Sequence, residues 1–172
     1  MADFKKVHEA CSKCRKKISE YKIYIIDNKR ICTDCIYGNS KPFEIYPIGI
    51  VKNNLKRVGE GFGTIGKEDI SRIELIESQK PFLYKLEEEY YITIVYYLHE
   101  AESIKSVFKR GLDGKEVGVF ASRTPYRLSR IAIQDVKLLK VEGTTIFVEG
   151  LDAVNGTPIL DIKMRWLGLC KM

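Results

Sequence analysis

The chain has 172 residues, of which 45% are hydrophobic, and a formal net charge of +6. This length suits one medium-sized domain, or one domain with a small module, and the apolar content is sufficient for a folded core. No apolar run approaches the roughly 20 residues of a membrane-spanning helix, and the chain does not begin with a secretion signal, so we expect a cytoplasmic protein. The positive charge is equally typical of a protein with a polyanionic partner and of a basic surface that favours solubility.

The first forty residues carry two Cys-x-x-Cys pairs, Cys11 with Cys14 and Cys32 with Cys35. Each pair directs two sulfurs toward one point, and four thiolates complete a tetrahedron around Zn²⁺. Disulfides or one redox-active pair are the alternatives, but in a reducing compartment zinc is favoured. Because four thiolates leave no open position for water, we expect a structural metal and no catalytic role for it.

Between the two pairs, residues 22–26 and 29–31 are strand-like and flank the polar pair Asp27-Asn28, which predicts a β-hairpin. We therefore predict a zinc-ribbon module over residues 1–40 that needs its metal, because so short a segment buries little apolar surface. His8 is interpreted as an exposed residue and not as a ligand. A contact with RNA phosphates and a contact with another protein are both open as roles for this module.

A turn-rich boundary at residues 38–42 precedes a second domain, predicted over residues 43–172. Its first strand is predicted over residues 43–51, with Pro47 at an edge or bulge because proline has no amide proton. Residues 61–66 match the glycine pattern of dinucleotide-binding turns. A strand-like segment, residues 70–76, follows them in place of a helix, so we predict a flexible loop.

Further strands are predicted in the second half of the chain. Residues 90–98 are nearly all β-branched, aromatic or aliphatic, which predicts a buried strand that ends at His99. More apolar runs cover residues 131–141, 145–152 and 158–163. The polar loops between the runs carry six residues that we expect to line one pocket for a small polar ligand: Arg123, Tyr126, Arg127, Asp152, Asn155 and Thr157.

These segments resemble the TsaA-like proteins, whose characterised members are the TrmO-type tRNA methyltransferases. The family reads G-V-F-A-T-R-S-P where this chain has Gly-Val-Phe-Ala-Ser-Arg-Thr-Pro over residues 118–125. It reads G-L-D-x-x-D-G-T-P-V-L-D-I-K where residues 150–163 stand, with Asn155 in place of an aspartate. Residues 128–132 also differ, because the family has P-N-P-I-G there. The likeness covers most of residues 43–163 in the same order.

The resemblance implies a mostly β fold, a compact TsaA-like β-barrel with the zinc ribbon added in front. It also implies a homodimer, S-adenosylmethionine as methyl donor, and N6-methylation of the modified adenosine just 3′ of the tRNA anticodon. The alternative is a non-catalytic protein that binds S-adenosylmethionine or RNA in a diverged pocket. Restoring the diverged positions to the family pattern would distinguish the two.

The cofactor-binding residues implied by the resemblance are His99, Glu100, Arg123, Ile133, Asn155, Gly156 and Thr157. Arg123 is expected to meet the carboxylate of S-adenosylmethionine, and the backbone of residues 155–157 its adenine or ribose. The catalytic residues are left open among several candidates: Tyr126 for stacking on the target base, Arg127 for an RNA phosphate, and Asp152 or Asp161 for a general base. Cys170 is given no role.

Overall fold

A computed structural model describes residues 8–55, 70–101 and 103–165, which belong to two compact units. The first unit combines Met1–Glu44 with Glu102–Leu128, and the second combines Ile45–Ala101 with Ser129–Met172. The predicted glycine loop 61–66 and Cys170 lie outside the described residues. The predicted division of the chain near residues 40–43 stays a prediction, and the association of Glu102–Leu128 with the N-terminal segment was not foreseen.

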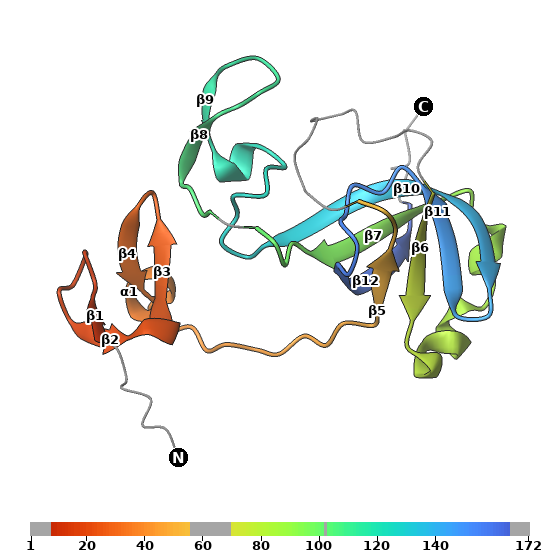
Figure 1. Cartoon of the computed structure of the whole chain (residues 1–172), viewed down its shortest axis with the longest axis horizontal. Coiled ribbons are helices and arrows are strands. Elements are labelled where there is room, and N and C mark those ends of the chain that lie inside the picture. The colour runs from red at the N-terminus through yellow and green to blue at the C-terminus, as the bar shows by residue number, and fades with distance from the viewer. Residues whose placement is uncertain (1–7, 56–69, 102, 166–172) are drawn as a thin grey trace, which may run out of the picture. The chain divides into compact units, whose positions relative to one another are not determined.

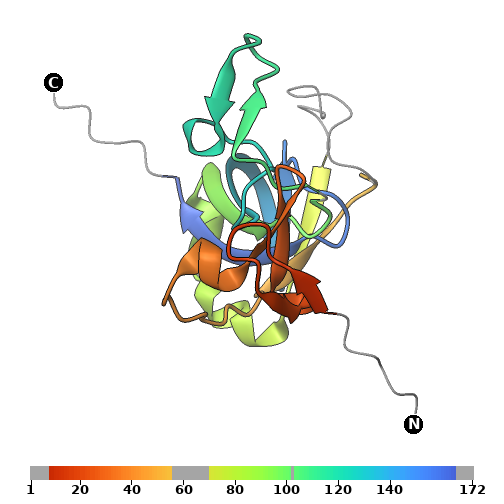
Figure 2. The same cartoon turned by 90° about the vertical axis from the view of Figure 1, so that its left-hand side faces the viewer.

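The second unit is a closed barrel of six strands, with the order β10-β11-β6-β5-β12-β7 (Figures 1 and 2). All neighbouring strands in the barrel are antiparallel. The mostly β fold with a compact barrel, predicted from the sequence, is therefore confirmed. The barrel strands are β5 (Gly49–Lys52), β6 (Ile70–Leu75), β7 (Tyr91–Tyr97), β10 (Ile131–Glu142), β11 (Thr145–Glu149) and β12 (Pro158–Met164).

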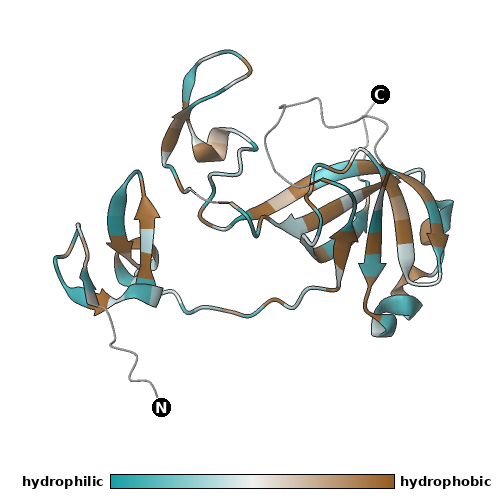
Figure 3. Cartoon of the chain, in the orientation of Figure 1, coloured by the Kyte–Doolittle hydropathy of each residue, from teal (hydrophilic) through white to brown (hydrophobic). Residues whose placement is uncertain are grey.

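Aliphatic side chains fill the barrel, and Figure 3 shows apolar positions alternating with polar ones along its strands. Ile73, Ile92 and Ile94 are fully buried, and each such side chain contributes about 1.5–3 kcal/mol by leaving water. The 3₁₀ helices η2 (Glu77–Leu83) and η3 (Leu86–Glu88) add Leu83 and Leu86 to this core. The core is therefore built from residues of the second unit.

Close approach of β5 to β6 requires a glycine at position 49. A Cβ atom there would lie 2.5 Å from the carbonyl oxygen of Glu74. Strand β5 is also shorter than predicted: it begins at Gly49, and residues 41–47 form no strand. The prediction of a strand over residues 43–51 was thus wrong in its extent, because Pro47 cannot donate to a ladder and Phe43 stays exposed. The strands predicted over residues 70–76, 90–98, 131–141 and 158–163 are confirmed, whereas the run 145–152 forms a strand only over Thr145–Glu149.

The first unit begins with two small antiparallel hairpins. Strand β1 (His8–Ala10) pairs with β2 (Lys17–Ser19), and the 3₁₀ helix η1 (Glu20–Lys22) leads into β3 (Ile23–Ile26), which pairs with β4 (Lys29–Cys32). Asp27 and Asn28, with φ of 47° and 62°, form a turn of the type whose twist suits a two-residue hairpin. The predicted hairpin is confirmed. It is followed by α1 (Thr33–Tyr37).

The rest of the first unit, residues 103–128, is called the insertion. It contains β8 (Val107–Lys109), which pairs with β9 (Glu116–Gly118), and the 3₁₀ helix η4 (Val119–Ala121). In sequence it connects β7 to β10, whose residues Tyr97 and Ile131 are paired. Across the described ranges 8–55, 70–101 and 103–165, no helix is long and apolar enough to span a bilayer.

Candidate functional site

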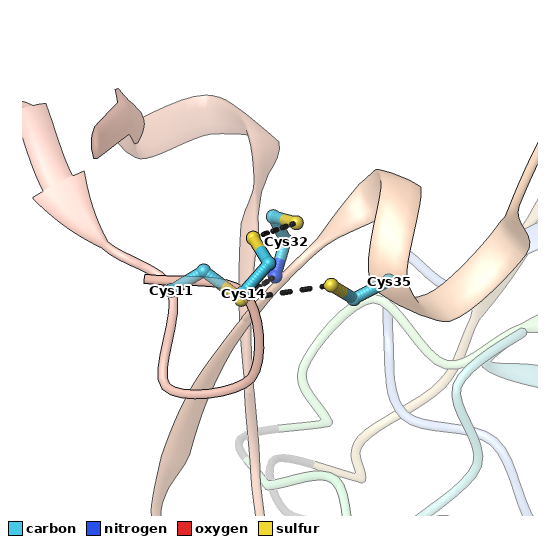
Figure 4. Close-up of side chains that lie close together, drawn as sticks. All are labelled: Cys11, Cys14, Cys32 and Cys35. Carbon is cyan, nitrogen blue, oxygen red and sulfur yellow. Dashed lines mark hydrogen bonds between the residues drawn. The ribbon is translucent and has the colours of Figure 1, made fainter. Parts of the chain in front are cut away.

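The four cysteine sulfurs converge on one point, as Figure 4 shows. The Sγ atoms of Cys11, Cys14, Cys32 and Cys35 all lie within 4.8 Å of one another, with Cys11 to Cys35 at 3.9 Å and Cys14 to Cys32 at 3.8 Å. A tetrahedral zinc ion with Zn–S bonds of about 2.3 Å separates its ligands by about 3.8 Å. The arrangement of donors therefore fits zinc, and all four predicted ligands belong to one cluster.

Local backbone structure directs these sulfurs. Cys11 and Cys14 lie in the turn after β1, which is closed by the bond from Arg15 N to Cys11 O at 2.8 Å. Cys32 ends β4 and Cys35 lies in α1. Backbone amides, with that of Cys14 as the largest influence, lower the pKa of Cys11 to about 6. This favours the thiolate, which is the form that binds metal.

A second cluster of polar residues lies at one end of the barrel. Thr157, which immediately precedes β12, is 2% exposed, and its Oγ1 lies 3.5 Å from Nδ1 of His99, which follows β7. Nε2 of His99 lies 3.7 Å from the Glu100 carboxylate. Gly156 has φ of 84°, and a Cβ there would lie 4.0 Å from Nε2 of His99. The structure thus brings together four predicted residues: His99, Glu100, Gly156 and Thr157.

Asn155 is fixed by a residue that the sequence interpretation missed. Oδ1 of Asn155 accepts a hydrogen bond from the backbone amide of Asn53 at 3.3 Å. The backbone amide of Asn155 donates to Leu55 O at 3.0 Å. Nδ2 of Asn53 donates to Ser71 Oγ and to Ala153 O, at 2.9 and 2.8 Å. Asn53 therefore fastens the 153–157 turn to the barrel. The available signal was an asparagine two residues after the end of the strand predicted over residues 43–51.

Asp152 lies in a turn held by Gln134, which was also missed. Gln134 Oε1 accepts from the Asp152 amide at 2.8 Å, and Gln134 Nε2 donates to Gly150 O at 2.7 Å. The buried Tyr96 hydroxyl, whose pKa is raised by desolvation, donates to Asp152 O at 2.9 Å. A polar side chain at an inward position of the strand predicted over residues 131–141 was the signal for Gln134.

The two candidate bases differ in what surrounds their carboxylates. Asp161 accepts from the Ile162 amide at 2.8 Å and forms an ion pair with Lys163 at 2.5 Å. The Asp152 carboxylate accepts no hydrogen bond from any residue within the described ranges. Desolvation raises the pKa of Asp152 above its ordinary value. Asp152 is thus the carboxylate that is available to a ligand.

Ile133 lies on β10 opposite Val95, and its side chain is 51% exposed.

The remaining predicted residues share one loop of the insertion. Arg127 Nη2 donates to the carbonyl oxygens of Val119 and Ser122, so this guanidinium shapes the loop itself. The Tyr126 ring meets the Phe108 ring edge-on at 5.6 Å, with Lys105 Nζ 4.4 Å from its centre. Arg123 is exposed and has no ion pair or hydrogen bond to any residue of the described part of the chain. That this loop and the His99 cluster line one pocket stays a prediction.

Comparison with known proteins shows which family the chain resembles. Residues 62–166 match the family tRNA-methyltransferase O N-terminal domain. A probable S-adenosyl-L-methionine-binding protein of Archaeoglobus fulgidus is 30% identical over 122 residues, which are 70% of this chain and 33% of that protein. A tRNA (adenine(37)-N6)-methyltransferase of Mus musculus is 34% identical over 95 residues, 54% of this chain and 22% of that protein. The chain thus spans a third or less of these two relatives.

A solved structure shares the fold. The crystal structure of TrmO from Pseudomonas aeruginosa matches with a TM-score of 0.60 and 22% sequence identity, over 77% of this chain and 60% of that one. The family match begins before β6 and ends after β12, so it contains five barrel strands and the insertion but not the four-cysteine cluster. Since that match covers more than half of the chain, the protein belongs to the TrmO family of tRNA-methyltransferase O N-terminal domains.

Proposed function

We propose that the chain binds S-adenosylmethionine and transfers its methyl group to N6 of an adenosine beside the tRNA anticodon. The family match over residues 62–166 carries this proposal. The names of the relatives supply its two parts, since one is a probable S-adenosyl-L-methionine-binding protein and another a tRNA (adenine(37)-N6)-methyltransferase. Methylation of tRNA also agrees with the positive net charge of the chain.

The polar groups at the barrel end have the chemistry that the methyl donor requires. S-adenosylmethionine supplies an electrophilic methyl group on a sulfonium, and it also presents a carboxylate, ribose hydroxyls and an adenine. His99, Thr157 and the backbone at Gly156 would bind its nucleoside part, because glycine permits close approach at a φ of 84°. Arg123 would bind the carboxylate, since its guanidinium is exposed and presents a fork of donors.

Proton removal is assigned to Asp152. Methylation of an amine nitrogen leaves one proton in excess, which a carboxylate within reach can accept. Asp152 suits this role better than Asp161, because Asp161 is already bonded to Lys163 and the Ile162 amide. The raised pKa of Asp152 makes its carboxylate a stronger base than an ordinary aspartate. Alignment of donor and acceptor supplies the rest of the acceleration.

The four-cysteine cluster holds one structural zinc ion in this proposal. Its sulfur separations of 3.8 and 3.9 Å suit a tetrahedral site, and four thiolates leave no position for a reacting water.

We also propose that the protein is a cytoplasmic homodimer. The outer face of the β7–β10 pair supports a dimer, because it exposes 37% of Ile131 and 51% of Ile133.

A non-catalytic binding protein is the second candidate. Asn155 favours it, because this side chain is uncharged and its Oδ1 is already occupied by the Asn53 amide. Replacing Asn155 by aspartate and restoring residues 128–132 to the family pattern separates the two functions. A large gain of methylation in the restored protein over a weakly active parent supports the enzyme.

The direct experiment combines calorimetry and methyl transfer. The full chain is titrated with S-adenosylmethionine, and tRNA is then incubated with the protein and the methyl-labelled donor. We expect binding, and we expect N6-methyladenosine in the nucleoside digest. Arg72→Ala is the control for Arg123→Ala, because Arg72 is also exposed but lies on β6. A parent protein that binds no S-adenosylmethionine, with or without tRNA, contradicts the proposal.

A further inference from the structure

The tip of the β3–β4 hairpin is bound to the start of the insertion. The Asp27 amide donates to Ile104 O at 3.1 Å, and Ile26 forms an isolated parallel bridge with Ile104. The Asp27 carboxylate accepts two further bonds, from the Ser106 amide at 2.9 Å and from the Ser106 hydroxyl. Ile104 is 8% exposed, so its apolar side chain is buried beside these polar contacts. Two segments that are 79 residues apart in sequence are thereby joined.

The same short segment holds both ends of the loop that carries Arg123. We call residues 119–127 the arginine loop. At its start, the Val119 amide donates to Ser106 O at 3.1 Å. At its end, the Lys105 amide donates to Tyr126 O at 3.2 Å, and Lys105 Nζ lies 4.4 Å from the centre of the Tyr126 ring. Ser106 therefore contacts Asp27 on one side and the arginine loop on the other.

The hairpin is continuous with the cysteine cluster. The Ser12 amide, between Cys11 and Cys14, donates to Arg30 O on β4 at 2.8 Å. Cys32 is itself paired with Ile23 in the β3–β4 ladder. A metal bound by the four sulfurs therefore stabilises the hairpin whose tip presents Asp27. The Ser106 hydroxyl lowers the pKa of Asp27, which keeps the carboxylate ionised and able to accept both bonds.

We infer that Asp27 and Ser106 are positioning residues that connect the four-cysteine module to the arginine loop. The module thus has a function inside its own chain: it holds the backbone from which Arg123 projects. Where Arg123 meets the methyl donor, as the proposed function has it, binding of that donor depends on the Asp27–Ser106 contact. The role of the Asp27–Ser106 contact in holding the arginine loop does not depend on the proposed function.

Ser106 provides the sharpest test, because its side chain is exposed and a small change there leaves both cores intact. Ser106→Ala removes the hydroxyl that donates to Asp27, while Ser106→Thr retains a hydroxyl and is the conservative control. Asp27→Asn removes the charge and tolerates the positive φ of the turn, with Asp34→Asn on α1 as its control. All variants are compared as full chains loaded with zinc.

Hydrogen exchange of the amides at 119–127 is the main measurement. We expect Ser106→Ala and Asp27→Asn to speed exchange there about tenfold or more, since the first removes a hydrogen bond to the carboxylate and the second removes the charge that strengthens both bonds. Exchange in β7 and β12, and the content of one zinc per chain, should stay as in the parent. Ser106→Thr and Asp34→Asn should behave as the parent. Unchanged exchange at 119–127 in Ser106→Ala, or equal acceleration in Ser106→Thr, overturns the inference.

Titration with S-adenosylmethionine separates this inference from the proposed function. If both hold, the Kd rises about tenfold in Ser106→Ala and stays near the parent value in Ser106→Thr. If the parent binds no donor, the proposed function fails while the exchange data still decide the inference. A parent that binds the donor and a Ser106→Ala variant with faster loop exchange but unchanged Kd overturn the link to Arg123.

Discussion

Thr157 Oγ1 lies 3.5 Å from His99 Nδ1, and barrel register sets this distance. Strands β7 and β12 are paired, with Ile159 opposite Tyr96, so the residue before β12 is held close to the residues after β7. Neither residue depends on a long loop for its placement. The candidate site therefore has a rigid part, formed by the barrel, to which the proposed ligand would bind with little reorganisation.

Gly156 tests whether the space beside His99 is used. Gly156→Ala should weaken binding of S-adenosylmethionine at least tenfold, because its Cβ would lie 4.0 Å from His99 Nε2, where we place the nucleoside. The positive φ should also cost about 1 kcal/mol of stability. Gly143→Ala is the matched control: φ there is 61° and nothing lies within 4 Å of its Cβ. Calorimetry and denaturant unfolding of both variants measure the two effects. Equal affinity in both variants contradicts the placement.

Arg123 should act in binding alone. We expect Arg123→Ala to raise the Kd for S-adenosylmethionine about 10- to 100-fold, which corresponds to a lost charge-assisted contact. Arg123→Lys should recover only part of the affinity, because an ammonium group cannot form the two parallel bonds of a guanidinium. Thermal unfolding should be unchanged, since Arg123 is exposed. S-adenosylhomocysteine retains the carboxylate, so its affinity should fall in parallel, and a fall for one ligand only is the contrary result.

The pH dependence of methyl transfer tests Asp152. A base works in its ionised form, so the rate should rise as pH increases through the pKa of Asp152, which desolvation has raised. The acid limb should therefore lie at a higher pH than an ordinary aspartate gives. Asp152→Asn should remove this limb and lower the rate about 10²- to 10⁴-fold. Asp161→Asn should retain the limb, and a limb that disappears in this variant would move the role to Asp161.

The raised pKa of Asp152 also makes folding stability depend on pH, in a direction that can be tested. A carboxyl group whose pKa is raised in the folded state binds its proton more tightly there than in the unfolded chain. The stability it contributes is present at low pH and is lost as pH rises through the folded pKa. At neutral pH, Asp152→Asn should thus have a slightly higher Tm than the parent. A Tm below that of the parent is expected only in acid. A neutral-pH Tm that falls argues for a structural role of the carboxylate.

Zinc should be bound by the cysteine cluster and by no other part of the chain. Elemental analysis should give about one zinc per chain for the parent and for Cys170→Ser, and none for Cys32→Ser. Cys32→Ser should also lose protection from hydrogen exchange across β3 and β4, since metal binding supplies much of the folding free energy of so small a module. The barrel should persist, because its core lies between Val51 and Ile159. Melting of the barrel in this variant would show that the two cores are not independent.

Local patterns in the sequence were sufficient for the hairpin and for most strands. Asp27-Asn28 specifies its turn directly, and residues 90–98 specify a strand by their side chains alone. The extent of β5 was misjudged because apolar residues before Pro47, such as Phe43, remain exposed. The cluster of four cysteines was predictable because their spacing is itself the signal for a metal site.

Other features could not be predicted because they depend on contacts between distant segments. Gln134 and Asn53 act through backbone groups of the 150–155 turn, and nothing in the neighbouring sequence identifies those partners. The contact between Asp27 and Ser106 likewise joins segments that no local periodicity relates. The role of Arg127 toward an RNA phosphate stays a prediction, and nothing in the sequence indicated that its Nη2 also donates to the carbonyl oxygens of Val119 and Ser122.

The insertion leaves and re-enters the barrel at one place, where Leu98 N donates to Arg130 O at 2.8 Å. A short turn and a long insertion at that position should give barrels of nearly equal stability, because doubling the length of a loop costs only about 0.6 kcal/mol in closure entropy. A chain in which a few glycines replace residues 102–128 should still close its sheet. A change in the length of the insertion outside the arginine loop can therefore alter a recognition surface without rebuilding the scaffold that carries His99.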